Sequence, residues 1–158
     1  MNTEFILIGI VIIIVIMIFI FKRNSSNKVP RQIKLDQLEL IMNLLTAKKF
    51  EGDFFGITSN YIDCIYFVDN KGKINIEFEV MTDDQKPYLD KIKEFAKMNG
   101  YQTTMTTYGN KPIYDDLREA PVVKIESNAD RKTATELGKR IMLNVFNCNT
   151  TMKFEIIP

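Results

Sequence analysis

Residues 5–21 read FILIGIVIIIVIMIFIF and contain no charged or polar side chain. Glu4 precedes this stretch, and Lys22 and Arg23 follow it. A helix rises about 1.5 Å per residue, so the stretch would span roughly 25 Å of a hydrocarbon core about 30 Å thick. The side chains of Lys22 and Arg23 can reach toward the lipid headgroups from the end of such a helix. Because a lone strand cannot satisfy its backbone groups in lipid, the sequence predicts a single transmembrane helix within residues 1–23.

Two other interpretations of the apolar stretch fit the residues less well. A cleaved signal peptide needs a basic start and small residues at its cleavage site. Residues 1–4 contain no Lys or Arg, and the stretch ends in Phe19–Phe21. A buried core helix would need a larger surrounding domain than this chain supplies. We therefore expect an uncleaved membrane anchor that contacts the bilayer through residues 5–21.

Basic residues follow the apolar stretch, and none precedes it. The positive-inside rule then places the C-terminal part of the chain in the cytoplasm. Two cysteines far apart in the sequence agree with a reducing compartment, although they do not exclude one bridge. The basic cluster is either a topology signal alone or an additional attraction to anionic lipid, at about 1 kcal/mol per residue. Its members are Lys22, Arg23, Lys28, Arg31 and Lys34.

Composition divides the chain into an anchor at residues 1–23, a polar linker at residues 24–30 and a soluble domain at residues 31–158. The domain is close to neutral, because three of the 21 Lys and Arg residues and one of the 20 Asp and Glu residues precede it. A nucleic-acid-binding domain would carry a basic face, so we expect no nucleic-acid partner.

Apolar residues in 31–50 follow a helical spacing and cover more than half of the predicted helix. Leu35, Leu38, Ile41, Met42 and Leu45 form one face. A second group lies roughly 120° away, since successive residues turn by about 100°. That second face either packs between the sheet and another helix or contacts a partner protein. Its members are Ile33, Leu40 and Leu44.

The remaining pattern predicts strands and helices in the order αβββαββαβ. Residues 61–68 are apolar on both faces, which is typical of a central strand, and residues 74–80 alternate cleanly. We expect an α+β domain with one mostly antiparallel sheet of about six strands and three helices. The expected strands are 54–57, 61–68, 74–80, 101–107, 122–126 and 152–157, and the later helices follow the caps at 82–84 and at Asn128 or Asp130.

The longest irregular stretch covers residues 108–121 and combines aromatic and acidic side chains. Long loops in a compact domain are often functional, and a disordered loop is an equal alternative. The stretch predicts a solvated acidic loop, a partner-binding loop or, least well supported, a carboxylate site for a metal or for acid–base chemistry. Its candidate residues are Tyr108, Tyr114, Asp115, Asp116 and Glu119.

The chain has no histidine and only two cysteines. This excludes nucleophiles that a histidine activates and a zinc site built on histidine. No glycine-rich phosphate loop or calcium loop occurs in the sequence. Cys64 and Cys148 are interpreted as small core residues. We expect no cofactor, no metal and no small-molecule substrate.

These patterns favour a non-enzymatic function. The leading hypothesis is a single-pass, membrane-anchored cytoplasmic module that recruits an unknown protein partner. The alternative is a membrane-anchored immunity or inhibitor protein that neutralises a toxin or an enzyme. An enzyme that uses carboxylates and a metal is the third hypothesis.

Overall fold

The computed structural model describes residues 29–107 and 120–158. The predicted anchor, with Lys22 and Arg23, lies outside these described residues. The candidate loop residues also lie outside them, namely Tyr108, Tyr114, Asp115, Asp116 and Glu119. Within residues 29–107 and 120–158, no helix has the length and apolar character needed to cross a membrane.

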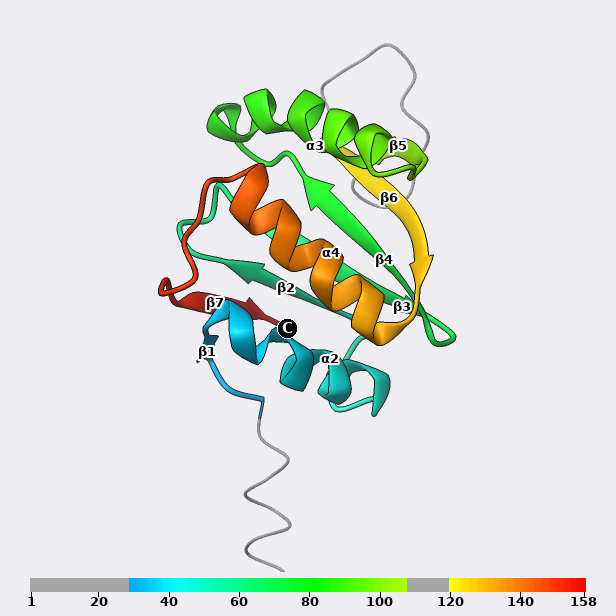
Figure 1. Ribbon diagram of the computed structural model, residues 1–158, viewed down its shortest axis with the longest axis vertical. Coiled ribbons are helices and arrows are strands. Elements are labelled where there is room, and N and C mark those ends of the chain that lie inside the picture. The colour runs from blue at the N-terminus through cyan, green and yellow to red at the C-terminus, as the bar shows by residue number, and fades with distance from the viewer. Residues whose placement is uncertain (1–28, 108–119) are drawn as a thin grey trace, which may run out of the picture.

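A seven-stranded antiparallel sheet forms one layer of the fold (Figure 1). The strand order is β1-β7-β2-β3-β4-β6-β5, and every neighbouring pair is antiparallel. The prediction of an α+β domain with a mostly antiparallel sheet is therefore confirmed. The strands are β1 (Gln32–Ile33), β2 (Phe54–Thr58), β3 (Ile65–Asn70), β4 (Lys73–Glu79), β5 (Thr103–Thr107), β6 (Pro121–Ala129) and β7 (Phe154–Ile157).

Three α-helices form the second layer, and all of them lie on one side of the sheet (Figure 1). They are α2 (Leu38–Thr46), α3 (Lys86–Met98) and α4 (Arg131–Asn144), with short 3₁₀ turns η1 (Leu35–Gln37) and η2 (Asp83–Gln85) before the first two. Asp130 caps α4, because its carboxylate accepts a hydrogen bond from the Thr133 amide at 2.8 Å. One hydrophobic core joins side chains from all three helices to one face of the sheet.

The predicted helix over residues 31–50 is wrong at both ends. Gln32 and Ile33 instead form β1 and pair with Glu155 and Phe154 of β7. The Lys34 amide then donates to the Gln37 side chain at 2.9 Å, which starts the turn before α2. The helical spacing was therefore overridden by pairing with a strand more than a hundred residues away in sequence.

The helix α4 connects two strands that run in the same direction. Four antiparallel pairings separate β6 from β7 in the sheet, so both strands point the same way. The connection from β6 through α4 to β7 therefore joins two parallel strands that are not neighbours in the sheet. Consequently β4, β3 and β2 lie between them, beneath α4, at the centre of the sheet.

Candidate functional site

The second face of the sheet is not covered by any helix of the described residues. We call it the helix-free face and define it by Phe54, Tyr66, Val68, Glu77, Glu79, Lys124 and Ile157. This face is turned away from the viewer in Figure 1. The alternation along each strand sends the neighbours of these residues, such as Phe55, Phe67 and Ile76, into the core. The helix-free face is the main candidate for a functional surface.

One row of directly paired residues crosses this face from β7 to β5. Ile157 pairs with Gly56, Gly56 with Tyr66, and Tyr66 with Glu77. Glu77 in turn pairs with Lys124, which pairs with Thr104. Side chains that are directly opposite on neighbouring strands lie about 5 Å apart, so the row is one continuous strip. The strip is apolar toward β7 and charged toward β6.

The Tyr66 ring lies over Gly56 at the apolar end of the strip. A Cβ atom added to Gly56 would lie 2.9 Å from the Tyr66 ring and 3.3 Å from the Ile157 Cβ. The Phe54 ring meets the Tyr66 ring at an interplanar angle of 62°, with 6.3 Å between centroids. Phe54 is 41% exposed, and Val68 and Ile157 are half-buried. The absence of a side chain at Gly56 therefore lets the Tyr66 ring lie close against the sheet, where the Phe54 ring meets it edge-on.

Two half-buried glutamates form the charged end. Burial raises the pKa of the Glu77 carboxyl, and Lys124 partly offsets this effect. Burial raises the pKa of the Glu79 carboxyl, and the charge of Glu77 adds to the shift. Within the described chain, no hydrogen bond or ion pair reaches either carboxylate. Among the described residues, the one cation that lowers either pKa is Lys124, and it acts on Glu77.

A second polar cluster surrounds Asp63 in the loop between β2 and β3. The Asp63 side chain is buried and accepts hydrogen bonds from the Thr58 hydroxyl at 2.8 Å and the Ser59 amide at 2.7 Å. It also accepts from the Ser59 hydroxyl and from the Cys148 thiol at 3.2 Å. Burial acts to raise the pKa of Asp63, but these donors together hold it below its ordinary value. The loop is thereby fixed in one conformation, and the predicted start of β3 at Tyr61 is corrected to Ile65.

The two thiols are protonated in this environment. Burial raises the pKa of Cys64 to about 11. Burial, followed by the hydrogen bond and charge of Asp63, raises the pKa of Cys148 to about 12. Because the thiolate is the nucleophilic form, neither cysteine is activated for nucleophilic attack at neutral pH. Cys148 acts instead as a hydrogen-bond donor that helps to satisfy Asp63.

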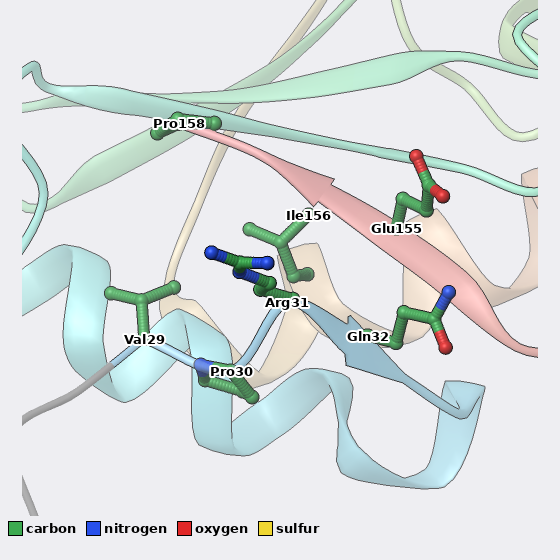
Figure 2. A pocket seen from close by; sticks show the side chains of 7 residues that line it. All are labelled: Val29, Pro30, Arg31, Gln32, Glu155, Ile156 and Pro158. Atoms are coloured by element: carbon green, nitrogen blue, oxygen red, sulfur yellow. The ribbon is translucent and has the colours of Figure 1, made fainter.

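An open pocket of about 750 Å³ lies where the chain enters the domain (Figure 2). Arg31 and Ile156 point toward one another beside Val29, and the Ile156 amide donates to the Arg31 carbonyl at 2.9 Å. Gln32 and Glu155 form a cross-strand pair at the far side of the same pocket. With a single cation and one carboxylate, this pocket offers little charge selectivity. It marks the attachment point of the preceding chain at one edge of the sheet.

The structure separates the residues predicted as a second face of the first helix. Ile33 lies on β1 and is 3% exposed, because it is part of the core. Leu44 is half-buried against the core, whereas Leu40 is 54% exposed on α2. These three residues therefore do not form one contact surface, and only Leu40 is presented to solvent.

Sequence reasoning did not identify the helix-free face as a candidate site. The apolar residues on both faces of 61–68 were interpreted as the mark of a buried central strand. The strand β3 is indeed central, but only one of its faces is covered by helices. An excess of apolar residues on the second face was the available signal.

Within residues 29–107 and 120–158, no group of three or more Cys, Asp or Glu side chains is arranged to hold a metal ion. Comparisons of the chain with protein-family models, with curated proteins and with solved structures give no match.

Proposed function

We propose that this protein is a single-pass, membrane-anchored cytoplasmic module that binds a partner protein and has no catalytic activity. The observation that carries the proposal is the helix-free face, where Phe54, Tyr66 and Val68 are partly exposed beside two carboxylates that have no ion-pair partner among residues 29–107 and 120–158. A partly apolar surface with a polar rim is typical of protein-binding sites. The apolar stretch at residues 5–21 would hold this surface at the membrane.

The position of the tether supports this proposal. The chain enters the domain through Val29 and Pro30, immediately before β1 at the edge of the sheet. The first described residues therefore lie at an edge of the sheet and not over either of its broad faces. The helix-free face can therefore receive a partner while residues 5–21 occupy the bilayer.

The local chemistry also supports binding rather than catalysis. Asp63 is the most deeply buried carboxylate of the polar cluster, and hydrogen-bond donors already occupy it. The raised pKa values of Cys64 and Cys148 keep both thiols protonated. The groups that most resemble catalytic machinery thus act in stabilising the fold.

The proposal is tested by crosslinking in native membranes. The full-length chain is compared with a variant that lacks residues 1–23 and with a tether-only variant of residues 1–30. We expect one or more proteins to crosslink to the full-length chain in the membrane fraction. They should not crosslink to the tether alone, and they should leave the membrane fraction with the truncated variant. A crosslinked set that is identical for the full-length chain and the tether alone would contradict the proposed function.

A further inference from the structure

We propose that the β1–β7 edge of the domain binds the phosphate of an anionic lipid headgroup, with Lys34 and Lys153 as its cationic contacts. This inference rests on the proposed function, because the membrane would be the one that residues 5–21 enter. It adds a second contact with the bilayer, which would fix how the domain lies against the membrane surface.

Strand pairing brings the two lysines together although they are far apart in the sequence. Gln32 and Ile33 of β1 pair with Glu155 and Phe154 of β7. Lys34 follows β1 and Lys153 precedes β7, and both line one open pocket of about 300 Å³. Local spacing could not associate Lys153 with the basic residues that follow residues 5–21.

The pocket offers positive charge and hydrogen-bond donors, and none of the described residues that line it is acidic. The lining residues are Gln32, Ile33, Lys34, Gln37 and Lys153. The Gln37 side-chain oxygen already accepts a hydrogen bond from the Lys34 amide at 2.9 Å, so the Gln37 amino group is the part left to donate. Two ammonium groups and an amide donor form a set that fits the oxygens of a phosphate.

Both lysines are exposed, and neither has an ion-pair partner within residues 29–107 and 120–158. Lys48 and Lys139, by contrast, bind carboxylates at 2.7 and 2.8 Å. Two like charges beside one pocket destabilise each other, and an anion bound between them offsets this repulsion. The pocket therefore favours an anionic ligand.

Two acidic residues of the same edge lie outside this pocket. Glu155 lines the neighbouring pocket, where its carboxylate accepts a hydrogen bond from the Tyr61 hydroxyl at 2.7 Å. Asp36 belongs to η1 and does not line the pocket of the two lysines. Arg31 is exposed in the neighbouring pocket and adds a third cation to the edge. The pocket itself thus stays cationic.

The place of the pocket favours a lipid over a soluble anion. The chain between Phe21 and Lys34 can span at most about 45 Å, at about 3.5 Å per residue. An anchor in the bilayer would therefore keep the pocket near the headgroups. Leu40 is 54% exposed and follows Gln37 by three residues, which places the two side by side on the helix. Such an apolar side chain suits the boundary between headgroups and acyl chains, whereas a free phosphate gains nothing from it.

The test measures how close this edge lies to the headgroups. The full-length chain is reconstituted into phosphatidylcholine vesicles, with or without phosphatidylserine, that carry a nitroxide quencher on a lipid headgroup. A fluorescent maleimide is attached to Leu40→Cys or, in a separate sample, to Met98→Cys. Met98 is also an exposed apolar helix residue, but α3 packs on β5 and β6 at the other edge of the sheet. The unaltered chain, with Cys64 and Cys148, controls for background labelling.

We expect phosphatidylserine to raise quenching at position 40 roughly twofold or more and to leave quenching at position 98 unchanged. Lys34→Gln with Lys153→Gln should lower the ratio of docked to free domain roughly 25-fold, since each basic residue near an anionic surface contributes about a factor of five. Lys34→Arg with Lys153→Arg keeps both charges and should retain the quenching. The matched pair Lys97→Gln with Lys132→Gln removes two charges from exposed helix positions and should also retain it.

Inorganic phosphate distinguishes the lipid from a soluble anion. Replacement of chloride by phosphate at equal ionic strength should leave the quenching at position 40 unchanged. A loss of quenching in phosphate would show that the pocket prefers the soluble anion and would overturn the inference.

A carbonate wash of the same vesicles separates the inference from the proposed function. If the chain stays in the vesicles but phosphatidylserine acts equally on positions 40 and 98, the inference fails and the proposed function stands. The same holds if the loss of the charges at Lys34 and Lys153 has no greater effect than the matched pair. If the wash releases the chain, both fail.

Discussion

Asp63 illustrates how one buried carboxylate can fix a loop. Four residues supply its hydrogen bonds, and three of these lie within five positions of it in sequence. The fourth, Cys148, comes from the segment after α4 and ties the loop to the C-terminal part of the fold. Gln85 adds to this by donating from its side chain to the Tyr61 carbonyl at 3.0 Å. These hydrogen bonds therefore hold the loop that leads into β3 in one conformation.

Replacement of Asp63 by Asn should lower the free energy of unfolding by about 2 kcal/mol, because hydrogen bonds to a charged acceptor contribute about 1.5–3 kcal/mol. The control is Asp53→Asn, whose carboxylate forms an exposed ion pair with Lys48 at 2.7 Å and should cost less than about 1 kcal/mol. Urea unfolding of the detergent-solubilised full-length chain gives both values. Equal losses for the two variants would contradict the structural role of Asp63.

The same variant has a defined pH dependence. The pKa of Asp63 is lowered in the folded state, so its stabilising contribution is fully present above the pKa of the unfolded chain, near 4. It is lost as the pH falls through the lower folded pKa. The difference in unfolding free energy between the native chain and Asp63→Asn should be constant from pH 5 to 7 and should shrink below about pH 4. A difference that grows on acidification would reverse the predicted sign.

At the scale of elements, α4 and β3 approach closely at Gly138. A Cβ atom at this position would overlap the Phe67 ring, with Cε1 only 2.6 Å away, and Phe67 is fully buried. At Gly56 the corresponding Cβ would meet the ring of Tyr66 at 2.9 Å, but Tyr66 is half-buried on the helix-free face. The Phe67 ring is enclosed in the core and has little room to move, whereas the Tyr66 side chain is only half-buried.

We therefore expect Gly138→Ala to destabilise the fold by about 1–3 kcal/mol through overpacking. Alanine is more favourable than glycine inside a helix by roughly 1 kcal/mol. This gain offsets part of the overpacking cost, but the variant is still expected to be less stable. Gly56→Ala should cost less than about 1 kcal/mol and serves as the matched comparison. Thermal unfolding followed by circular dichroism measures both. A larger loss for Gly56→Ala would show that the contact at the helix-free face, and not α4, is the tighter one.

The sequence predicted secondary structure correctly where neighbouring residues alone determine it. The residues expected to form strands on either side of positions 69–73 do so, and the turn between them contains Gly72 with a φ of 85°. The alternation of residues 74–80 placed Ile74, Ile76 and Phe78 in the core, where they are found. Ile33 was assigned to a helix instead, because its pairing with Phe154 is a long-range contact that no local spacing encodes. Which face of the sheet the helices cover also depends on long-range packing, so local spacing could not predict it.

At the scale of the whole molecule, the proposed function requires the apolar stretch at residues 5–21 to hold a two-layer domain with one helix-free face at the membrane. The tether would enter at the β1 edge, beside the pocket around Arg31 (Figure 2). Under the proposed function, the domain would present its helix-free face to cytosolic proteins while remaining near the bilayer. This arrangement depends on the side of the membrane on which the domain lies.

The most direct measurement is the accessibility of an engineered cysteine in intact cells. Lys132→Cys places a thiol at an exposed position in the first turn of α4, and the unaltered chain, with Cys64 buried and Cys148 half-buried, controls for background. A maleimide that cannot cross membranes is added before or after permeabilisation. We predict labelling of Lys132→Cys only after permeabilisation. Full labelling in intact cells would place the domain outside the cytoplasm and contradict the account.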